Sequence, residues 1–189
     1  MITVIGSVNM DLIATTPRLP EPGETVAGTD FATAQGGKGA NQALAAQRAG
    51  ASVKMCGAVG NDAFAGEALA LLDAAGADLS LVRHIDGPTG TALILVGGDG
   101  ENMIAVIPGA NGQVTPADAE RAVAAMAATD TLVLQMEIPE AAIEAALKAA
   151  RARGVRSVLN IAPLTDAVEP NSPGCQAGRR KRPKRPGRN

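Results

Sequence analysis

The sequence predicts an α/β protein whose doubly wound, mostly parallel sheet is flanked by helices and carries a small antiparallel β lid. Two observations lead to this fold class. Through most of the 189 residues, short apolar runs alternate with helical segments, which is the rhythm of right-handed β-α-β units. Two segments, about 12–35 and 89–107, depart from that rhythm because they are rich in strand-forming residues and contain no helix. We expect these two segments to form the lid.

The strands of the main sheet are predicted where the chain is apolar and β-branched, and the helices where polar caps and glycines frame an alanine-rich run. The helix after Asn61-Asp62 is expected to bury Phe64, Ala68, Leu71, Leu72 and Ala75. The predicted strands are 2–8, 52–59, 131–136 and 155–160, and the predicted helices are 41–49, 64–75, a segment that Thr115-Pro116 opens, and 139–153.

Within the lid, residues 12–22 contain three prolines and are predicted to be an edge strand or a loop, because proline cannot donate a ladder hydrogen bond. Residues 25–35 alternate weakly and are predicted to form an exposed strand that leads into a glycine-rich loop. Residues 89–96 and 103–107 are two further β-rich runs. The Gly-Gly-Asp-Gly sequence between them is a strong hairpin signal.

The distribution of charge and the two cysteines indicate how the chain is divided and in which compartment the protein is expected. The net charge is −2, but residues 171–189 hold seven of the 17 basic residues and none of the 19 acidic ones, so the rest of the chain carries −9. Cys56 and Cys175 lack the spacing of metal ligands, and Cys56 lies in an apolar strand. A buried thiol is therefore expected, in a reducing cytoplasm.

Polar residues interrupt the first apolar run early, which argues against a signal peptide or a membrane span.

A glycine-rich stretch is the first candidate for a ligand site: residues 36–43 read Gly-Gly-Lys-Gly-Ala-Asn-Gln-Ala and open an alanine-rich helix. Glycine lets a ligand lie directly against the backbone, and free N–H groups of the helix would point back at the loop. With Lys38 and Asn41, this favours a small, oxygen-rich ligand, phosphorylated or not. The alternative is a helix start that needs a tight turn. The spacing matches neither a nucleotide P-loop nor a dinucleotide-binding fingerprint.

Other polar residues follow predicted strands, and open α/β sheets bind ligands at the carboxyl ends of their strands. Asn9 and Asp11 follow the first strand, and Glu137 follows the third. A carboxylate at Asp11 can accept hydrogen bonds from two adjacent sugar hydroxyls, although Asp11 also suits a turn. Glu137 equally suits the N-terminus of a helix, where the helix dipole stabilises an acid. Asn61-Asp62 and the lone His84 have simpler interpretations, as a helix cap and as a strand or surface residue.

The glycine-rich stretch resembles the first signature of the ribokinase-like carbohydrate kinase family. Three further pieces agree with that family in order and spacing: Gly-Ser-Val-Asn-Met-Asp at 6–11, Pro-Gly-Glu-Thr-Val at 22–26 and Pro-Gly-Ala-Asn at 108–111. The resemblance covers about residues 1–168. It implies that eight residues at matching motif positions bind the acceptor sugar, namely Asn9, Asp11, Gly36, Gly37, Lys38, Gly39, Asn41 and Glu137.

The same resemblance implies an activity and partners. It implies ATP-dependent phosphorylation of the 5-hydroxyl of D-ribose to give D-ribose 5-phosphate, with Mg²⁺ and a monovalent cation such as K⁺. It also implies a small-molecule sugar as ligand and a homodimer formed through the β lid. Two alternatives are a non-catalytic sugar-binding or lid-dimerising fragment, and a kinase for another sugar or a nucleoside. No membrane partner is expected, and a nucleic-acid partner is not favoured.

After Val168 the sequence departs from the family pattern. In the family, a Gly-Ala-Gly-Asp element of the C-terminal half provides the catalytic base, and that element does not occur here. We therefore expect residues 1–170 to be the N-terminal part of the family fold, with the C-terminal half missing, no catalytic or metal-ligating residue and no kinase activity. Residues 171–189 are expected to be a disordered basic tail, explained by a frameshift, by a basic arm for acidic partners or by an inert extension.

Overall fold

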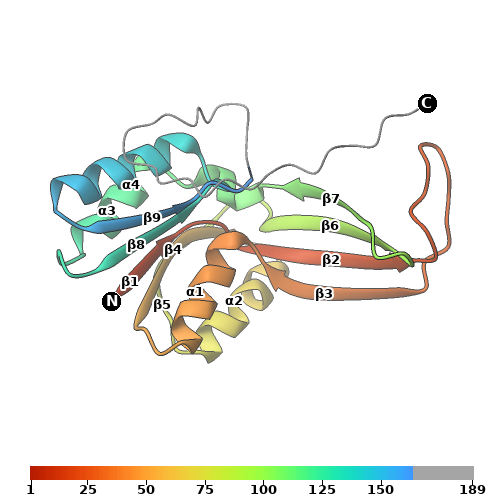
Figure 1. Cartoon of the computed structure of the whole chain (residues 1–189), viewed down its shortest axis with the longest axis horizontal. Helices are drawn as coiled ribbons and strands as arrows, with labels where there is room; N and C mark the ends of the chain where they lie inside the picture. The colour runs from red at the N-terminus through yellow and green to blue at the C-terminus, as the bar shows by residue number, and fades with distance from the viewer. Residues whose placement is uncertain (164–189) are drawn as a thin grey trace.

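The computed structural model describes residues 1–163, which fold into two sheets and four α-helices (Figure 1). The predicted boundary at residue 170 and the predicted basic tail, 171–189, lie outside the described residues. Of the two sheets, the larger is flanked by helices, and the smaller extends away from it to one side (Figure 1).

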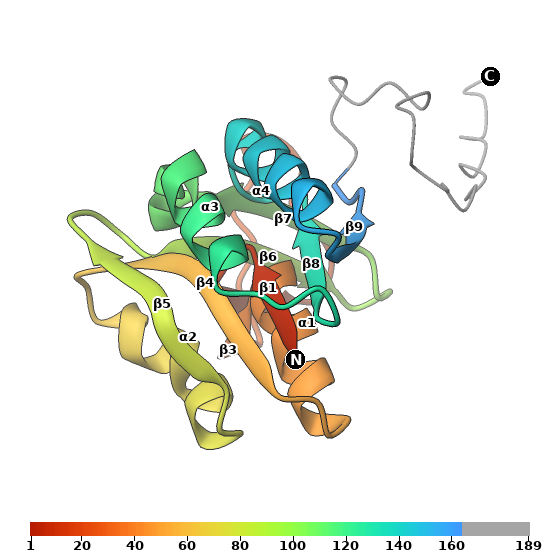
Figure 2. The same cartoon turned by 90° about the vertical axis from the view of Figure 1, so that its left-hand side faces the viewer.

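The main sheet has five strands: β1 Ile2–Ile5, β4 Val53–Gly60, β5 Asp78–Ile85, β8 Thr131–Gln135 and β9 Arg156–Asn160. All pair in parallel, in the order β5-β4-β1-β8-β9. The helices are α1 Lys38–Arg48, α2 Phe64–Ala74, α3 Pro116–Ala124 and α4 Glu140–Ala152. Figure 2 shows α1 and α2 on one face of this sheet and α3 and α4 on the other. The predicted doubly wound α/β class is confirmed.

A hydrophobic core lies on each face of the main sheet. Side chains of a strand alternate between faces, so adjacent residues of β1 serve different cores. Val4 packs into the core beneath α1 and α2, and Ile5 packs into the core beneath α3 and α4. Both side chains are fully buried. This explains why β1 is a continuous apolar run rather than an alternating one.

The smaller sheet is the lid, with strands β2 Asn9–Thr16, β3 Asp30–Gly36, β6 Gly90–Gly97 and β7 Asn102–Ile107 in the order β3-β2-β6-β7. The hairpin between β6 and β7 is confirmed. The lid is nevertheless mixed rather than purely antiparallel, because β2 and β6 run parallel. Between these two strands the chain passes through α1, β4, α2 and β5, so no hairpin turn constrains them to antiparallel pairing.

The prediction that residues 12–22 form an edge strand or a loop was wrong for 12–16 and right for 17–22, which form a loop. β2 is an interior strand of the lid, paired on both sides by β3 and β6. Its three downstream prolines do not disturb this pairing, since β2 ends at Thr16 and Pro17 follows it. Asn9 and Asp11 consequently lie within a strand of the lid rather than in a loop after β1.

Two smaller predictions also need correction. β5 was not among the predicted main-sheet strands, because it is an edge strand in which polar residues interrupt the apolar pattern. His84 lies exposed on this strand, as expected. The buried face of α2 is rotated from the predicted one, and Leu71 is 38 % exposed. Alanines on several sides of this helix made its apolar face ambiguous. The residues that α2 buries are Ala65, Ala68, Leu69 and Leu72.

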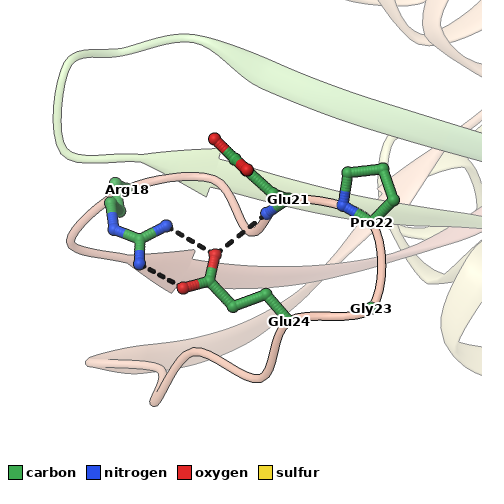
Figure 3. A pocket seen from close by; sticks show the side chains of 5 residues that line it. All are labelled: Arg18, Glu21, Pro22, Gly23 and Glu24. Atoms are coloured by element: carbon green, nitrogen blue, oxygen red, sulfur yellow. Dashed lines mark hydrogen bonds and ion pairs between the residues drawn. The ribbon is translucent and has the colours of Figure 1, made fainter.

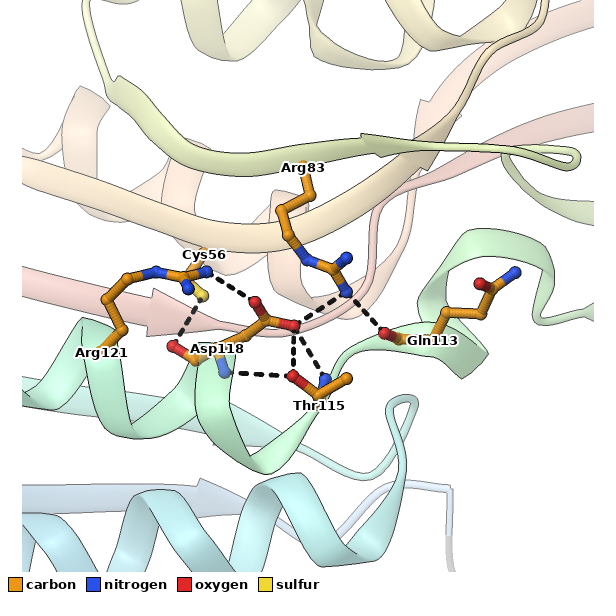
Figure 4. Close-up of polar contacts among 6 residues, drawn as sticks. All are labelled: Cys56, Arg83, Gln113, Thr115, Asp118 and Arg121. Carbon is orange, nitrogen blue, oxygen red and sulfur yellow. Dashed lines mark hydrogen bonds and ion pairs between the residues drawn. The ribbon is translucent and has the colours of Figure 1, made fainter.

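Asp118 joins α3 to the edge strand β5 (Figure 4). Its carboxylate accepts hydrogen bonds from Thr115 N and Oγ1 at 2.9 and 2.7 Å, and it pairs with Arg83 at 2.8 Å and Arg121 at 2.6 Å. Thr115 Oγ1 in turn accepts from Asp118 N, so the predicted cap at Thr115 is confirmed as a capping box. Burial raises the pKa of Asp118, but the hydrogen bonds from Thr115 and Arg121 and the charge of Arg83 outweigh it and lower the pKa.

Asp118→Ala is expected to lower the free energy of unfolding by about 2 kcal/mol at neutral pH, because the helix cap and two charged partners are lost. The folded-state pKa of Asp118 is below the unfolded value of about 3.9. The stabilisation is therefore complete above the unfolded pKa and is lost as pH falls through the folded pKa. Urea unfolding near neutral pH and at about pH 2 measures this.

The control variant for Asp118→Ala is Glu120→Ala, which changes an exposed acid on the same helix. It is expected to alter the free energy of unfolding by less than about 0.5 kcal/mol. A difference between wild type and Asp118→Ala that stays constant across this pH range would contradict the assigned role.

Candidate functional site

The candidate site lies at the topological switch point of the main sheet, where the strand order reverses. From β1 the chain first adds β4 and β5 on one side, and later β8 and β9 on the other, so β1 lies at the switch point. Ligands of open α/β sheets bind beyond the carboxyl ends of strands at such a point. Three segments meet there: the start of β2 after β1, the N-terminus of α1, and the residue Glu137 after β8.

These segments enclose a cavity of about 160 Å³ between the lid and the main domain. One wall is polar and the other is an apolar surface of β6 and β7. The residues that line it are Asn9, Asp11, Gly37, Lys38, Asn41, Ala92, Ile94, Ile104, Val106 and Glu137.

Six of the eight residues predicted to bind a ligand line this cavity, and two glycines do not. Gly36 instead allows close approach of the Asp11 side chain, and Gly39 allows close approach of the backbone at Ser7. A Cβ at Gly36 would lie 2.3 Å from Asp11 Oδ1. A Cβ at Gly39 would lie 2.6 Å from Ser7 N. The two glycines therefore shape the cavity without lining it.

Asp11 presents a half-buried carboxylate to the cavity. Burial raises the pKa of Asp11, the nearby Glu137 carboxylate raises it further, and the charge of Lys38 lowers it in part. Within residues 1–163, no donor forms a hydrogen bond with this carboxylate. A desolvated acceptor without a protein partner is suited to hydroxyl groups of a ligand.

Glu137 is held by three donors. Its Oε2 accepts from Ser7 Oγ at 2.6 Å and from Lys38 N at 3.0 Å, and its Oε1 pairs with Lys38 Nζ. Burial raises the pKa of Glu137, but the hydrogen bonds from Lys38 and Ser7 outweigh burial and lower it. Glu137 is therefore an ionised member of an internal ion pair at the base of the cavity.

The prediction of free amide groups at the N-terminus of α1 was wrong. Lys38 N donates to Glu137, Gly39 N donates to Ser7 Oγ at 3.3 Å, and Ala40 N donates to Ser7 O at 2.9 Å. The helix dipole stabilises the protein's own carboxylate, Glu137, instead of a ligand anion. This leaves hydroxyl recognition by Asp11 as the main polar contribution, and it removes the reason to expect a phosphorylated ligand. Gly37 precedes α1 with φ of 88°, so the tight turn is also confirmed.

Asn9 is oriented by a residue that was not among the predicted site residues. Asn111 Nδ2 donates to Asn9 Oδ1 at 2.7 Å and to Val8 O at 3.1 Å, and Asn111 Oδ1 accepts from Val8 N at 2.9 Å. Asn111 is only 1 % exposed. Because Asn9 Oδ1 is occupied, the amide group of Asn9 remains as a donor for a ligand oxygen.

Sequence reasoning missed three kinds of residue here: Ser7, Asn111, and the apolar wall of the lid. Ser7 and Asn111 belong to motifs that were recognised, but a buried residue that acts through a neighbour leaves no local pattern. The wall could have been found from the alternation along β6 and β7, since every second residue of a strand faces the same side. Its larger members are Ile94, Ile104 and Val106.

A larger hollow, about 650 Å³, lies far from this site, at the tip of the lid (Figure 3). A single loop lines it, and Glu24 closes the loop by pairing with Arg18 and accepting a hydrogen bond from Glu21 N at 3.0 Å. These contacts pair Arg18 with Glu24 and leave the Glu21 carboxylate as the one other charged group that lines the hollow. The hollow is therefore a consequence of how the loop folds back, and it offers no convergent unpaired groups.

No group of three or more His, Cys, Asp or Glu side chains within residues 1–163 is arranged to hold a metal ion. None of the helices described here has the length and apolar character needed to cross a membrane.

Comparison with known proteins agrees with the fold and identifies the family. The family model for pfkB family carbohydrate kinases matches residues 1–175. Ribokinase from Bacillus subtilis is 42 % identical over 165 residues, which cover 86 % of this chain and 55 % of the relative. Deoxyribokinase from Salmonella typhi is 36 % identical over 163 residues, or 86 % of this chain and 53 % of the relative.

Among solved structures, ribokinase from Arabidopsis thaliana complexed with ribose and ATP superposes with a TM-score of 0.73 at 30 % identity, covering 85 % of this chain and 53 % of that one. The chain thus spans about half the length of the relatives that it matches. Because the family model covers most of its length, the chain belongs to the pfkB family of carbohydrate kinases.

Proposed function

We propose that this chain provides the acceptor-sugar site of a kinase that phosphorylates D-ribose on its 5-hydroxyl with ATP, giving D-ribose 5-phosphate. The observation that carries the proposal is the polar cavity in which the Asp11 carboxylate has no hydrogen-bond donor among residues 1–163. Similarity to ribokinases, one of them solved with ribose and ATP, supports D-ribose as the sugar. All eight residues named from the motifs belong to this proposed site, six as cavity lining and two as glycine spacers.

Each side of the cavity has a distinct part in binding. The Asp11 carboxylate accepts hydrogen bonds from two vicinal hydroxyls, and the Asn9 amide donates to a sugar oxygen. The apolar side chains of β6 and β7 pack against the C–H face of the ring and exclude water. The Lys38–Glu137 pair holds the glycine-rich turn against the base of the cavity.

ATP, Mg²⁺ and a monovalent cation such as K⁺ belong to the same proposal. ATP supplies the phosphoryl group that the sugar hydroxyl receives. Residues 1–163 contain no group of three His, Cys, Asp or Glu side chains arranged to hold a metal ion. The part of the reaction that these residues perform is therefore limited to binding and orienting the sugar.

Calorimetric titration of the chain with D-ribose tests the proposal. We expect saturable binding at one site, weaker binding of 2-deoxy-D-ribose, which lacks one of the vicinal hydroxyls, and weaker binding of adenosine. Tighter binding of adenosine would favour a nucleoside kinase, and no binding of any of the three would reject the sugar site. A phosphoryl-transfer assay with ATP and Mg²⁺ on the same preparation separates a catalytic chain from a sugar-binding module.

The proposal includes homodimerisation through the lid. The lid exposes large apolar side chains on both of its faces, and contiguous patches of this kind mark interaction surfaces. Met103 and Val106, one on each face, are 52 % and 51 % exposed. We expect a concentration-dependent dimer in sedimentation analysis, which Met103→Glu or Val106→Glu weakens. A wild-type chain that stays monomeric at all concentrations would contradict dimerisation.

The proposal also places the protein in the cytoplasm. Cys56 is a free, fully buried cysteine, and burial raises the pKa of its thiol to about 11. An inert reduced thiol of this kind is usual in a reducing compartment.

A further inference from the structure

Ser7 occupies the point where β1, the glycine-rich turn and Glu137 meet. It lies between β1 and β2, and its side chain is completely buried. Ser7 Oγ donates to Glu137 Oε2 at 2.6 Å, because the ionised carboxylate has no proton to give. The same oxygen then accepts from Gly39 N at 3.3 Å. One hydroxyl group therefore links the carboxylate to the first turn of α1.

Ser7 has no access to a ligand. It is not among the residues that line the cavity, and none of its surface is exposed. Any influence on binding must pass through the groups that it holds. We propose that Ser7 is a positioning residue for the sugar site, which fixes the Glu137 carboxylate on Lys38 and so keeps Lys38 away from Asp11.

Two charged side chains face Glu137 from the elements packed around it: Lys38 from α1 and Asp11 from β2. Both acids attract Lys38, since its charge lowers the pKa of each of them. Lys38 pairs with Glu137, and the Asp11 carboxylate is left for the ligand. Without the Ser7 hydroxyl, the Glu137 carboxylate loses one of the three contacts that fix its orientation, so its pairing with Lys38 is less well held in place. Lys38 then competes with the sugar for Asp11.

This inference rests on the proposed function, but its first test requires no sugar. The Glu137 carboxyl group is titrated by ¹³C NMR in the ligand-free full chain, for wild type and Ser7→Ala. We expect the midpoint of Glu137 to rise in Ser7→Ala, because the Ser7 hydrogen bond favours the charged form. The midpoint of Asp11 should fall, because Lys38 moves closer to it.

The second test measures D-ribose binding by the same variants. Ser7→Ala is expected to weaken binding by about tenfold, as the loss of one charged hydrogen bond allows. In the Glu137→Gln background, Ser7→Ala should have little further effect, since Ser7 acts through the Glu137 charge. If wild type binds no D-ribose, the proposed function fails, yet the titration still decides whether Ser7 positions Glu137.

Thr3→Val is the matched control. Thr3 is a fully buried hydroxyl residue of the neighbouring strand β1, and its Oγ1 forms no hydrogen bond with the described residues. This variant should leave both midpoints and D-ribose binding unchanged. Should Ser7→Ala fail to fold, Ser7→Cys, which fills the site with a weaker donor, takes its place in each measurement. Unchanged Glu137 and Asp11 midpoints in the Ser7 variant would overturn the proposal.

Discussion

Asp11→Ala is expected to weaken D-ribose binding by about a hundredfold and to leave the fold intact. Two hydrogen bonds to a charged group are lost, each contributing about 1.5–3 kcal/mol, and water entering the vacated site offsets part of that loss. A net loss of about 3 kcal/mol corresponds to that factor. Asp11→Asn should be milder, because one acceptor oxygen remains. Calorimetric titration of the three proteins with D-ribose measures the effect.

The stability of Asp11→Ala separates a ligand-binding role from a purely structural role within β2. The folded-state pKa of Asp11 is raised, mainly by burial, so ionisation of Asp11 destabilises the fold as pH rises through the unfolded and then the folded pKa. Removing the carboxylate should therefore maintain or increase the free energy of unfolding at neutral pH. A residue with only a structural role would show the reverse, with lowered stability and normal binding.

The raised pKa also predicts a pH dependence of binding. D-ribose binding by wild type should decline as pH falls through the raised pKa of Asp11, because the protonated carboxyl group is a poorer acceptor. Asp30→Ala, which removes an exposed acid on the lid strand β3, serves as the control and should bind D-ribose normally. An Asp11→Ala variant that binds D-ribose within about threefold of wild type would contradict the site assignment.

Gly39→Ala is expected to reduce the free energy of unfolding by about 3 kcal/mol, the upper part of the usual range for overpacking. The added Cβ would lie 2.6 Å from Ser7 N and 2.7 Å from Ser7 O. These are backbone atoms at the carboxyl end of β1, which cannot move aside as a flexible side chain would. Relief of the clash requires α1 to separate from β1, which breaks the hydrogen bond from Gly39 N to Ser7 Oγ.

Gly66→Ala is a close control, because Gly66 also lies in the first turn of its helix, α2, and nothing approaches its Cβ position within 4 Å. Alanine there should stabilise the protein by about 0.5–1 kcal/mol. Urea unfolding of both variants gives the comparison. If Gly39→Ala were as stable as Gly66→Ala, the close contact between α1 and β1 would be wrong.

The central strands β1, β4 and β8 of the main sheet could be predicted from the sequence because they are buried on both faces. Such strands are continuous apolar runs, and 52–59 and 131–136 were predicted to within one residue of β4 and β8. The edge strand β5 could not be found in this way, since one of its sides is exposed and its sequence carries polar residues. Prolines misled the prediction for 12–22, because their effect begins only after β2 has ended.

Site residues that line the cavity could be predicted from the sequence. Residues that act on the site through a neighbouring side chain could not. Asp11 and Lys38 were named from local motifs, and both line the cavity. Ser7 and Asn111 were not named, because their contacts reach residues 130 and 102 positions away in the sequence. Only the fold brings such partners together. The same holds for the amide groups of α1, which were expected to be free until the fold placed Glu137 against them.

Amide chemical shifts of the full chain, recorded during titration with D-ribose, test the sugar site most directly. The expected result is a set of saturable shifts confined to the residues around the cavity, above all Asp11, Lys38 and Asn41 on its polar wall and Ile104 and Val106 on its apolar wall. The same titration on Asp11→Ala should give no saturable shifts in that concentration range. Shifts in wild type that map to the tip of the lid around Arg18 and Glu24, or no shifts at all, would contradict a sugar site between the lid and the glycine-rich turn.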